Sequence, residues 1–186
     1  MAIKIIGYAG SILPVITLLL ACTFERPQIT STPMPTDSTA LEQEKLRIDS
    51  MLTSYHAAAA RADFDAYFNH FTDDAVFIGT DATELWHKPS FMAYSKPYFD
   101  QGKTWSFTAV QRNIYMHHEG TMAWFDELLD TRMKLCRGSG VAIKHNNAWK
   151  VQHYVLSMTI PNSQADTVIA AKAPIEDALL DSLMGR

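Results

Sequence analysis

A chain of 186 residues that is 47% hydrophobic and 19% charged has the composition of one globular domain with attachments rather than that of a disordered protein. Its net charge is −4, and its lysines and arginines do not gather into the basic stripe that nucleic-acid binding requires. We therefore expect no nucleic acid among its partners.

The N-terminal segment differs from the rest of the chain. Lys4 carries its only charge, an apolar run extends from Ile5 to Leu20, and the segment ends in Leu-Leu-Ala-Cys at residues 19–22. The run is short for a membrane-spanning helix, which needs about 20 apolar residues, and glycine and proline interrupt it. A charged start, an apolar middle and a small residue at the end are typical of a secretion signal.

The four-residue ending resembles the lipobox of bacterial lipoproteins. That resemblance implies cleavage before Cys22 and lipid attachment to its thiol, so the mature protein would be anchored by lipid to a membrane of the bacterial cell envelope, at its periplasmic or outer-membrane face. The alternative is an ordinary signal peptide or an uncleaved anchor, with Cys22 present by chance. Cleavage removes Lys4 and no acidic residue, which changes the net charge from −4 to −5.

Proline, serine and threonine dominate the stretch after Cys22, which predicts a flexible tether rather than a folded element. Acylation of Cys22 would leave Cys136 as the only free thiol, so we expect no intramolecular disulfide. Cys136 lies among strand-forming residues and is interpreted as a small buried hydrophobic residue rather than a nucleophile.

The folded part begins with two predicted helices. Thr39 and Glu42 have capping-box spacing, and Asp63 is a candidate cap for a second, shorter helix. Apolar residues recur at three- and four-residue steps through the first pattern, and aromatic residues through the second. The predicted core faces are Ile48, Met51, Leu52, Tyr55, Ala59 and Ala62, then Phe64, Tyr67, Phe68 and Phe71.

Strand signals dominate the middle of the chain. A strand at 76–79 and a short return at 84–86 flank Gly79-Thr80-Asp81, a predicted turn in which Asp81 satisfies backbone amides. Helical turns at 90–96 are expected to end at Pro97. Four long strands are then predicted at 103–117, 121–131, 132–144 and 148–160, and a helix at 174–184.

Helices followed by long antiparallel strands predict an α+β fold, with N-terminal helices packed on a strongly curved, mostly antiparallel sheet. A sheet that bends around helices leaves a cone-shaped pocket. Both faces of the last strands are apolar, which predicts that one face meets the helices and the other a partner subunit in a homodimer.

Several pieces of the chain resemble the SnoaL-like branch of the nuclear transport factor 2 superfamily. They are the stretches 71–81, 123–127, 137–140 and 149–157, together with Glu84 and Trp86. The resemblance covers about residues 44–160 and implies a cone-shaped fold. The superfamily contains isomerases, cyclases and dehydratases, but also transport, association and dimerisation domains, so the fold alone does not give the function.

The predicted organisation therefore has four parts: a signal peptide at 1–21, a lipid-anchored tether at 22–38, a SnoaL-like domain at 39–162 and a C-terminal helical tail at 163–186. Members of the group often carry a second histidine two residues after the one that matches His153, and this chain has Val155 there. That departure weakens the case for a site with two histidines.

Asp126 and His153 are the candidate catalytic residues for proton transfer. The resemblance suggests that the face carrying His153 looks into the cone, where an imidazole can move a proton near neutral pH. Asp126 and Glu127 are adjacent on a strand and must face opposite ways. Asp126 is chosen because related enzymes use a pocket aspartate, but parity leaves Glu127 open, and an ion pair with Arg137 or Arg132 is the structural alternative.

Further side chains are candidates for ligand binding. Arg137 precedes Gly-Ser-Gly and could bind a carboxylate with paired hydrogen bonds, although the glycines could instead mark a bulge. The predicted ligand-binding set is Glu84, Trp86, Tyr98, Trp105, Arg137 and Ser157. No pattern of metal ligands, phosphate loop or dinucleotide fingerprint is present in the sequence, so we expect neither metal nor cofactor.

Three functions remain open from the sequence. The favoured one is an envelope-anchored domain that binds a small apolar or carboxylate-bearing molecule in its pocket. The alternatives are a cofactor-independent isomerase, cyclase or dehydratase that uses a pocket Asp and His, and a non-catalytic dimerisation or association domain.

Overall fold

The computed structural model describes residues 38–186. The predicted signal peptide, the lipidation site Cys22 and the tether as far as residue 37 lie outside the described residues. In the described part, no helix combines the length and the apolar character needed to cross a membrane.

Both predicted N-terminal helices are present. Helix α1 spans Ser38–Ala60 and α2 spans Phe64–Asn69. The side chain of Asp63 accepts a hydrogen bond from the backbone N–H of Ala66 at 3.0 Å, which confirms its role as the α2 cap. The α1 residues that are buried include Ile48, Leu52, Tyr55 and Ala59, as the apolar stripe predicts.

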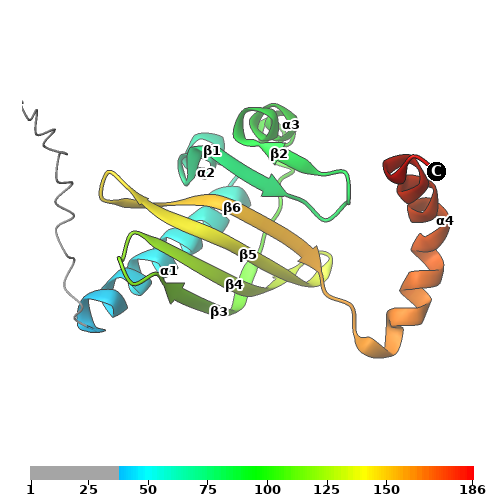
Figure 1. Ribbon diagram of the computed structural model, residues 1–186. Helices are drawn as coiled ribbons and strands as arrows, with labels where there is room; N and C mark the ends of the chain where they lie inside the picture. Colours follow the sequence, from blue (N-terminus) through cyan, green and yellow to red (C-terminus); the bar gives the residue numbers. More distant parts are fainter. Residues whose placement is uncertain (1–37) are drawn as a thin grey trace, which may run out of the picture. The chain divides into compact units, whose positions relative to one another are not determined.

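The strands form one six-stranded sheet in the order β2-β1-β6-β5-β4-β3. Strand β1 runs parallel to β6, and the remaining neighbours are antiparallel. Figure 1 shows α1 crossing one face of the curved sheet, with α3 beside β1 and β2, which confirms the α+β prediction. The strands are Phe71–Ile78 (β1), Leu85–His87 (β2), Thr108–Met116 (β3), Met122–Thr131 (β4), Lys134–His145 (β5) and Ala148–Met158 (β6).

Helix α3 is longer than the sequence predicts. It spans Lys88–Asp100 and continues through Pro97, where the sequence predicts its end. Phe91, Ser95 and Phe99 recur every four residues and are buried, whereas Pro97 lies on the exposed side. Burial of the inward face therefore outweighs the cost of a proline in the last turns of the helix.

The C-terminal helix also begins earlier than predicted. Helix α4 spans Ala165–Met184 after a short 3-10 turn at Asn162–Gln164, and it contains Pro174 rather than starting there. Gly185 caps it in the left-handed conformation, with φ of 65°. No residue of α4 is buried.

Strand β6 contains a β-bulge that the sequence does not reveal. On β5, Val141 and Ala142 are consecutive, but their partners on β6 are His153 and Val151, so Gln152 is the extra residue. An extra residue reverses the alternation of side chains along the rest of the strand.

The bulge decides which side chains of β6 face the helices. Trp149 and Val151 are buried before it, as expected, but Tyr154 and Leu156 are the buried residues after it. His153 therefore lies on the face of the sheet opposite to α1, which we call the outer face. The expectation that His153 looks into the cone is wrong, because simple alternation does not survive the bulge.

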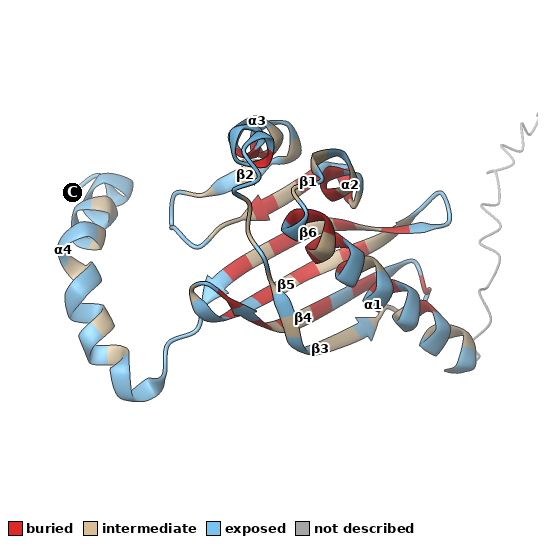
Figure 2. Ribbon diagram, turned by 180° about the vertical axis from the view of Figure 1, so that it is seen from behind, coloured by how far each residue is buried: buried red, intermediate tan, exposed pale blue. Residues whose placement is uncertain are grey.

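An aromatic core fills the space between the helices and the inner face of the sheet. Tyr55 and Tyr67 stack with ring centroids 4.8 Å apart, and their hydroxyls are hydrogen-bonded at 2.9 Å. Phe77 stacks on both Phe91 and Tyr154. Figure 2 shows the buried residues concentrated where α1 and α2 cross the strands. Cys136 belongs to this core and is fully buried, which confirms its interpretation as a hydrophobic residue.

Candidate functional site

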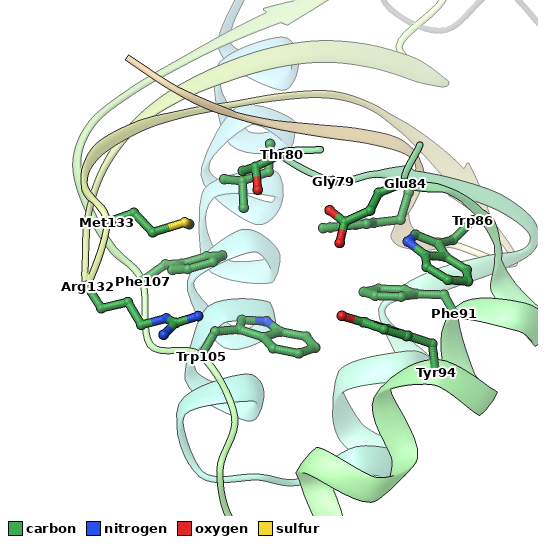
Figure 3. Close-up of a pocket in the computed structure, with 12 residues that line it drawn as sticks. Gly79, Thr80, Glu84, Trp86, Phe91, Tyr94, Trp105, Phe107, Arg132 and Met133 are labelled. Carbon is green, nitrogen blue, oxygen red and sulfur yellow. The ribbon is translucent and has the colours of Figure 1, made fainter. Parts of the chain in front are cut away.

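An aromatic cavity lies beside the β1–β2 hairpin, and we call it the inner pocket (Figure 3). It has a volume of about 170 Å³. The hairpin, α3, the segment before β3 and the β4–β5 turn contribute to it. The residues that line it are Phe77, Gly79, Thr80, Glu84, Trp86, Phe91, Tyr94, Trp105, Phe107, Arg132, Met133 and Leu156.

The β1–β2 hairpin positions the one carboxylate of the inner pocket. Asp81 accepts hydrogen bonds from the backbone N–H and the hydroxyl of Thr83 at 2.8 and 2.6 Å, which confirms its predicted turn role and lowers its pKa. The turn returns Glu84 over Gly79, where an added Cβ would collide with the Glu84 carboxylate. Gly79 therefore creates the room through which Glu84 reaches the pocket (Figure 3).

A hydroxyl and a guanidinium also point into the inner pocket. In Figure 3 the hydroxyl of Tyr94 and the guanidinium of Arg132 approach the cavity, and Arg132 lies on the side opposite to Glu84. Burial raises the pKa of Tyr94, with further contributions from Tyr98 and from the negative charge of Glu84, so the hydroxyl keeps its proton at neutral pH. Neither Glu84 nor Arg132 forms an ion pair with any residue in the range 38–186.

A second hollow adjoins the inner pocket, and we call it the vestibule. It shares Tyr94, Trp105 and Arg132 with the inner pocket and has a volume of about 430 Å³. The residues that line it are Tyr94, Tyr98, Lys103, Thr104, Trp105 and Arg132. The two hollows are therefore neighbours, and the vestibule has the more basic lining because it contains both Lys103 and Arg132.

The structure brings together only part of the predicted ligand-binding set. Glu84, Trp86 and Trp105 line the inner pocket, and Tyr98 lines the vestibule. Ser157 is exposed on β6, beyond the bulge, and is not among the lining residues of either hollow.

The remaining candidates lie on the outer face. Arg137 is exposed and donates a hydrogen bond to Asp126 at 3.0 Å, which is the ion pair considered as the structural alternative for Asp126. Arg137 pairs in register with Ser157, and His153 lies on the neighbouring strand of the same face. Asp126 and His153 are therefore on the same side of the sheet, but this side is opposite to the inner pocket.

Glu127, not Asp126, is the carboxylate that enters the interior. Glu127 is 0% exposed, whereas the side chain of Asp126 retains 29% exposure. The choice of Asp126 for the interior is thus corrected, and the physical reason is the strict alternation of β4, which pairs in register with β5 throughout.

Three side chains surround the Glu127 carboxylate and form, with it, a buried cluster. His56 Nε2 lies 3.1 Å from both carboxylate oxygens, Arg112 donates two hydrogen bonds at 2.9 and 2.7 Å, and the Tyr154 hydroxyl donates one at 3.3 Å. Arg112 is held in turn by Asp49 at 2.8 Å. The cluster satisfies every oxygen of the buried carboxylate.

These contacts determine the ionisation of the buried cluster. Burial alone would raise the pKa of Glu127, but the hydrogen bonds and charges of His56 and then Arg112 outweigh it and hold that pKa below its ordinary value. Burial and the neighbouring Glu127 charge raise the pKa of Tyr154 well above its ordinary value. Tyr154 is therefore a hydrogen-bond donor to an ionised Glu127.

The buried cluster lies one layer behind the inner pocket. The ring of His56 packs edge-on against Phe107 at 5.9 Å, and Tyr154 stacks on Phe77 at 5.7 Å. Phe107 and Phe77 both line the pocket, so aromatic rings separate the cluster from the cavity. Residues 38–186 contain no group of three or more His, Cys, Asp or Glu side chains placed to hold a metal ion.

Sequence reasoning missed the residues that complete both polar sites. Arg132 belongs to the β4–β5 turn, where Lys134 has a positive φ of 67°, and the sequence carries no glycine or asparagine there to mark a turn. His56 and Arg112 occur on the inward faces of α1 and β3. A charged residue at a predicted core position is a signal that could have identified them.

The family model of the SnoaL-like domain matches residues 48–161 of this chain. The chain belongs to the SnoaL-like domain family. No curated protein matches it at a significant level.

Solved structures support the fold of this SnoaL-like domain. An NTF2-like protein of unknown function from Pseudomonas putida KT2440 is 18% identical, with a TM-score of 0.55 over 68% of this chain and 92% of that one. A candidate dehydratase of the NTF2-like family from Streptomyces avermitilis is 11% identical, with a TM-score of 0.55 over 64% and 99%. A candidate Ca/calmodulin-dependent kinase II association domain from Exiguobacterium sibiricum 255-15 is 16% identical, with a TM-score of 0.52 over 69% and 99%. At these identities the likeness establishes the fold alone.

Proposed function

We propose that this SnoaL-like domain binds a small, largely apolar molecule in the inner pocket. The observation that carries the proposal is an aromatic cavity into which a carboxylate, a hydroxyl and a guanidinium point. Ligand sites typically combine a mostly apolar lining with a few convergent polar groups. The volume of about 170 Å³ is close to that of a cavity of about 150 Å³ that holds benzene, so the pocket accommodates one ring with small substituents.

Tryptophan substitutions test this proposal directly. We expect Trp105→Ala to weaken the binding of a simple aromatic probe such as phenol, measured by calorimetry, because Trp105 lines both the inner pocket and the vestibule. Trp124→Ala is the matched control, since Trp124 is 48% exposed and alternates with the inward-facing residues of β4. Equal affinities of the two variants, or no binding by the wild type, would contradict the proposal.

A second candidate function is proton transfer on the bound molecule. It is supported by the Glu84 carboxylate inside the aromatic pocket, which could act as a general base on a substrate within hydrogen-bond reach. A candidate dehydratase is among the structural neighbours. At saturating substrate, Glu84→Gln should abolish turnover, whereas Asp126→Asn should leave turnover unchanged. Normal turnover by Glu84→Gln would exclude this role for Glu84.

We also propose that the protein is anchored to the bacterial cell envelope through lipid on Cys22. The support is the lipobox-like ending of the N-terminal segment. Mass spectrometry of the protein from its bacterial membrane fraction should detect acyl chains on Cys22. A Cys22→Ser form that still carries those chains would contradict this assignment.

Homodimerisation through the outer face is a further part of the proposal. Tyr115 and Trp124 stack there with centroids 5.9 Å apart while remaining 46% and 48% exposed. Exposed aromatic residues on one face of a sheet are typical of protein interfaces. Light scattering should give the mass of a dimer for residues 38–186, and Trp124→Glu should give a monomer. A wild-type monomer at high concentration would contradict the proposal.

A further inference from the structure

The charged groups of the two hollows are not neutralised by the protein itself. Glu84 reaches the inner pocket on one side, and Arg132 reaches it from the other (Figure 3). Lys103 lines the vestibule beside Arg132. Within residues 38–186, no ion pair involves any of these three side chains.

The charged side chains of α3, which also contributes to both hollows, are by contrast paired within the protein. On α3, Lys96 forms an ion pair with Asp100, and Lys88 is paired with Asp73 at 3.0 Å. The lining of the vestibule contains two cations and no carboxylate, so this hollow has a net positive charge. A hollow with this charge attracts anions and can hold them by charge-assisted hydrogen bonds.

The opposite end of the inner pocket has the reverse chemistry. A carboxylate accepts hydrogen bonds, and the Glu84 carboxylate receives only one from the described residues, a long bond of 3.3 Å from the backbone N–H of Asp81. One carboxylate oxygen therefore remains available to a hydroxyl or amino group on a ligand. Gly79 maintains this arrangement, because a side chain there would displace the carboxylate.

The walls between the two ends are aromatic. Trp86 stacks on Tyr94 at 4.7 Å, and Trp105 stacks on Phe91 at 6.1 Å, so flat surfaces border the cavity from α3 and from the segment before β3. A volume of about 170 Å³ admits a single ring. Any acidic group on that ring must extend toward the vestibule, because the cations lie there.

We propose that the natural ligand is a single-ring aromatic carboxylic acid with a hydroxyl or amino group at its far end. The inference rests on the proposed binding function of the inner pocket. The ring occupies the inner pocket, the carboxylate lies between Arg132 and Lys103, and the hydroxyl or amino group donates to Glu84. This orientation pairs the three unneutralised charges of the two hollows with complementary groups of the ligand.

A set of three probes separates the parts of this inference. The probes are 3-(4-hydroxyphenyl)propionate, the corresponding neutral amide, and 3-phenylpropionate, which lacks the hydroxyl. Calorimetry should show that the first probe binds about tenfold more tightly than its amide, because a hydrogen bond to a charged group contributes at least that much. It should also bind several-fold more tightly than 3-phenylpropionate, because only the hydroxyl donates to Glu84.

Matched variants then test which charged side chain binds which group of the ligand. Arg132→Gln should lose about tenfold in affinity for 3-(4-hydroxyphenyl)propionate and leave the affinity for the amide unchanged. Arg137→Gln is the control, because Arg137 is an arginine of the neighbouring strand that lies on the outer face. Glu84→Gln should weaken the two hydroxylated probes and leave 3-phenylpropionate unaffected.

Each failure has a distinct meaning. If none of the three probes binds, both the proposed function and this inference are overturned. If the amide binds as tightly as the acid, or if Arg137→Gln weakens the acid as much as Arg132→Gln does, the pocket binds aromatic molecules but the inferred ligand class is wrong.

Discussion

The buried cluster and the inner pocket contain similar charged groups in opposite states. Glu127 is fully buried and accepts hydrogen bonds from three side chains, whereas Glu84 has one long bond from a backbone amide. Arg112 is paired with two carboxylates, and Arg132 with none in the described chain. The comparison shows that the charged groups of the buried cluster have their hydrogen-bond partners within the protein, whereas those of the inner pocket do not, and this difference is the basis of the proposed ligand binding.

Removal of Glu127 should have the largest effect on stability. Glu127→Ala leaves Arg112 and His56 buried without their partner, and the loss of one member of a buried ion pair typically costs about 3–5 kcal/mol. Chemical denaturation of residues 38–186 would measure this change. Asp126→Ala is the matched control on the same strand, where loss of the exposed pair with Arg137 should cost at most about 1 kcal/mol. Equal losses would remove the distinction between the two faces.

Low pH should reduce the stability that the same buried cluster contributes to the fold. Because the folded protein holds the pKa of Glu127 below its ordinary value of 4.5, the ionised carboxylate contributes stability that is present above pH 4.5 and is lost as the pH falls through the lowered pKa. His56, Arg112 and Tyr154 face the carboxylate and set this behaviour. The difference in unfolding free energy between the wild type and Glu127→Gln should therefore shrink below pH 4.5. A difference that stays constant from pH 7 to about pH 3 would contradict the assignment.

Substitution of Gly138 should lower the stability of the same region by a smaller amount. It pairs in register with Glu127, and an added Cβ would collide with the Tyr154 hydroxyl. Gly138→Ala should thus destabilise the domain by about 1–3 kcal/mol through overpacking. Tyr154→Phe in the Gly138→Ala background should recover part of that loss, since it removes the colliding atom. A double-mutant cycle in which the two changes simply add would show that the contact is not the cause.

Substitution of Arg132 should have the smallest effect on stability. Arg132 is exposed and has no partner among residues 38–186, so Arg132→Gln should change the unfolding free energy by no more than about 0.5 kcal/mol. Thermal and chemical denaturation would measure it beside Arg112→Gln, the matched variant in the buried cluster. A large loss in Arg132→Gln would mean that Arg132 supports the fold, and the contrast between the two regions would fail.

Local periodicity was enough to predict much of the fold. Some features follow from a residue pattern within one element and can be read directly from the sequence. They are the apolar stripe of α1, the cap at Asp63 and the strand-forming residues of the four long strands. The turn role of Asp81 and the burial of Cys136 were predictable for the same reason. Trp86 and Trp105 are predicted to bind a ligand; both line the inner pocket, and their role in binding stays a prediction.

The errors arose where the outcome depends on pairing between distant segments. Pro97 was expected to end a helix, but Phe91 and Phe99 hold α3 together by burial against the core. His153 was expected inside, but the bulge at Gln152 turns it to the outer face, and a bulge is visible only in the register between β5 and β6.

By itself, the sequence determined the α+β class and the set of elements, because hydrophobic periodicity and turn residues act over a few positions, and its resemblance to SnoaL-like domains indicated the family. Only the tertiary structure decided that Glu127 and not Asp126 is buried, that His56 and Arg112 complete its shell, and that Arg132 shares a pocket with Glu84. Strand alternation assigns neighbouring residues to opposite faces of the sheet but does not say which face is buried. The helices that cover one face determine this.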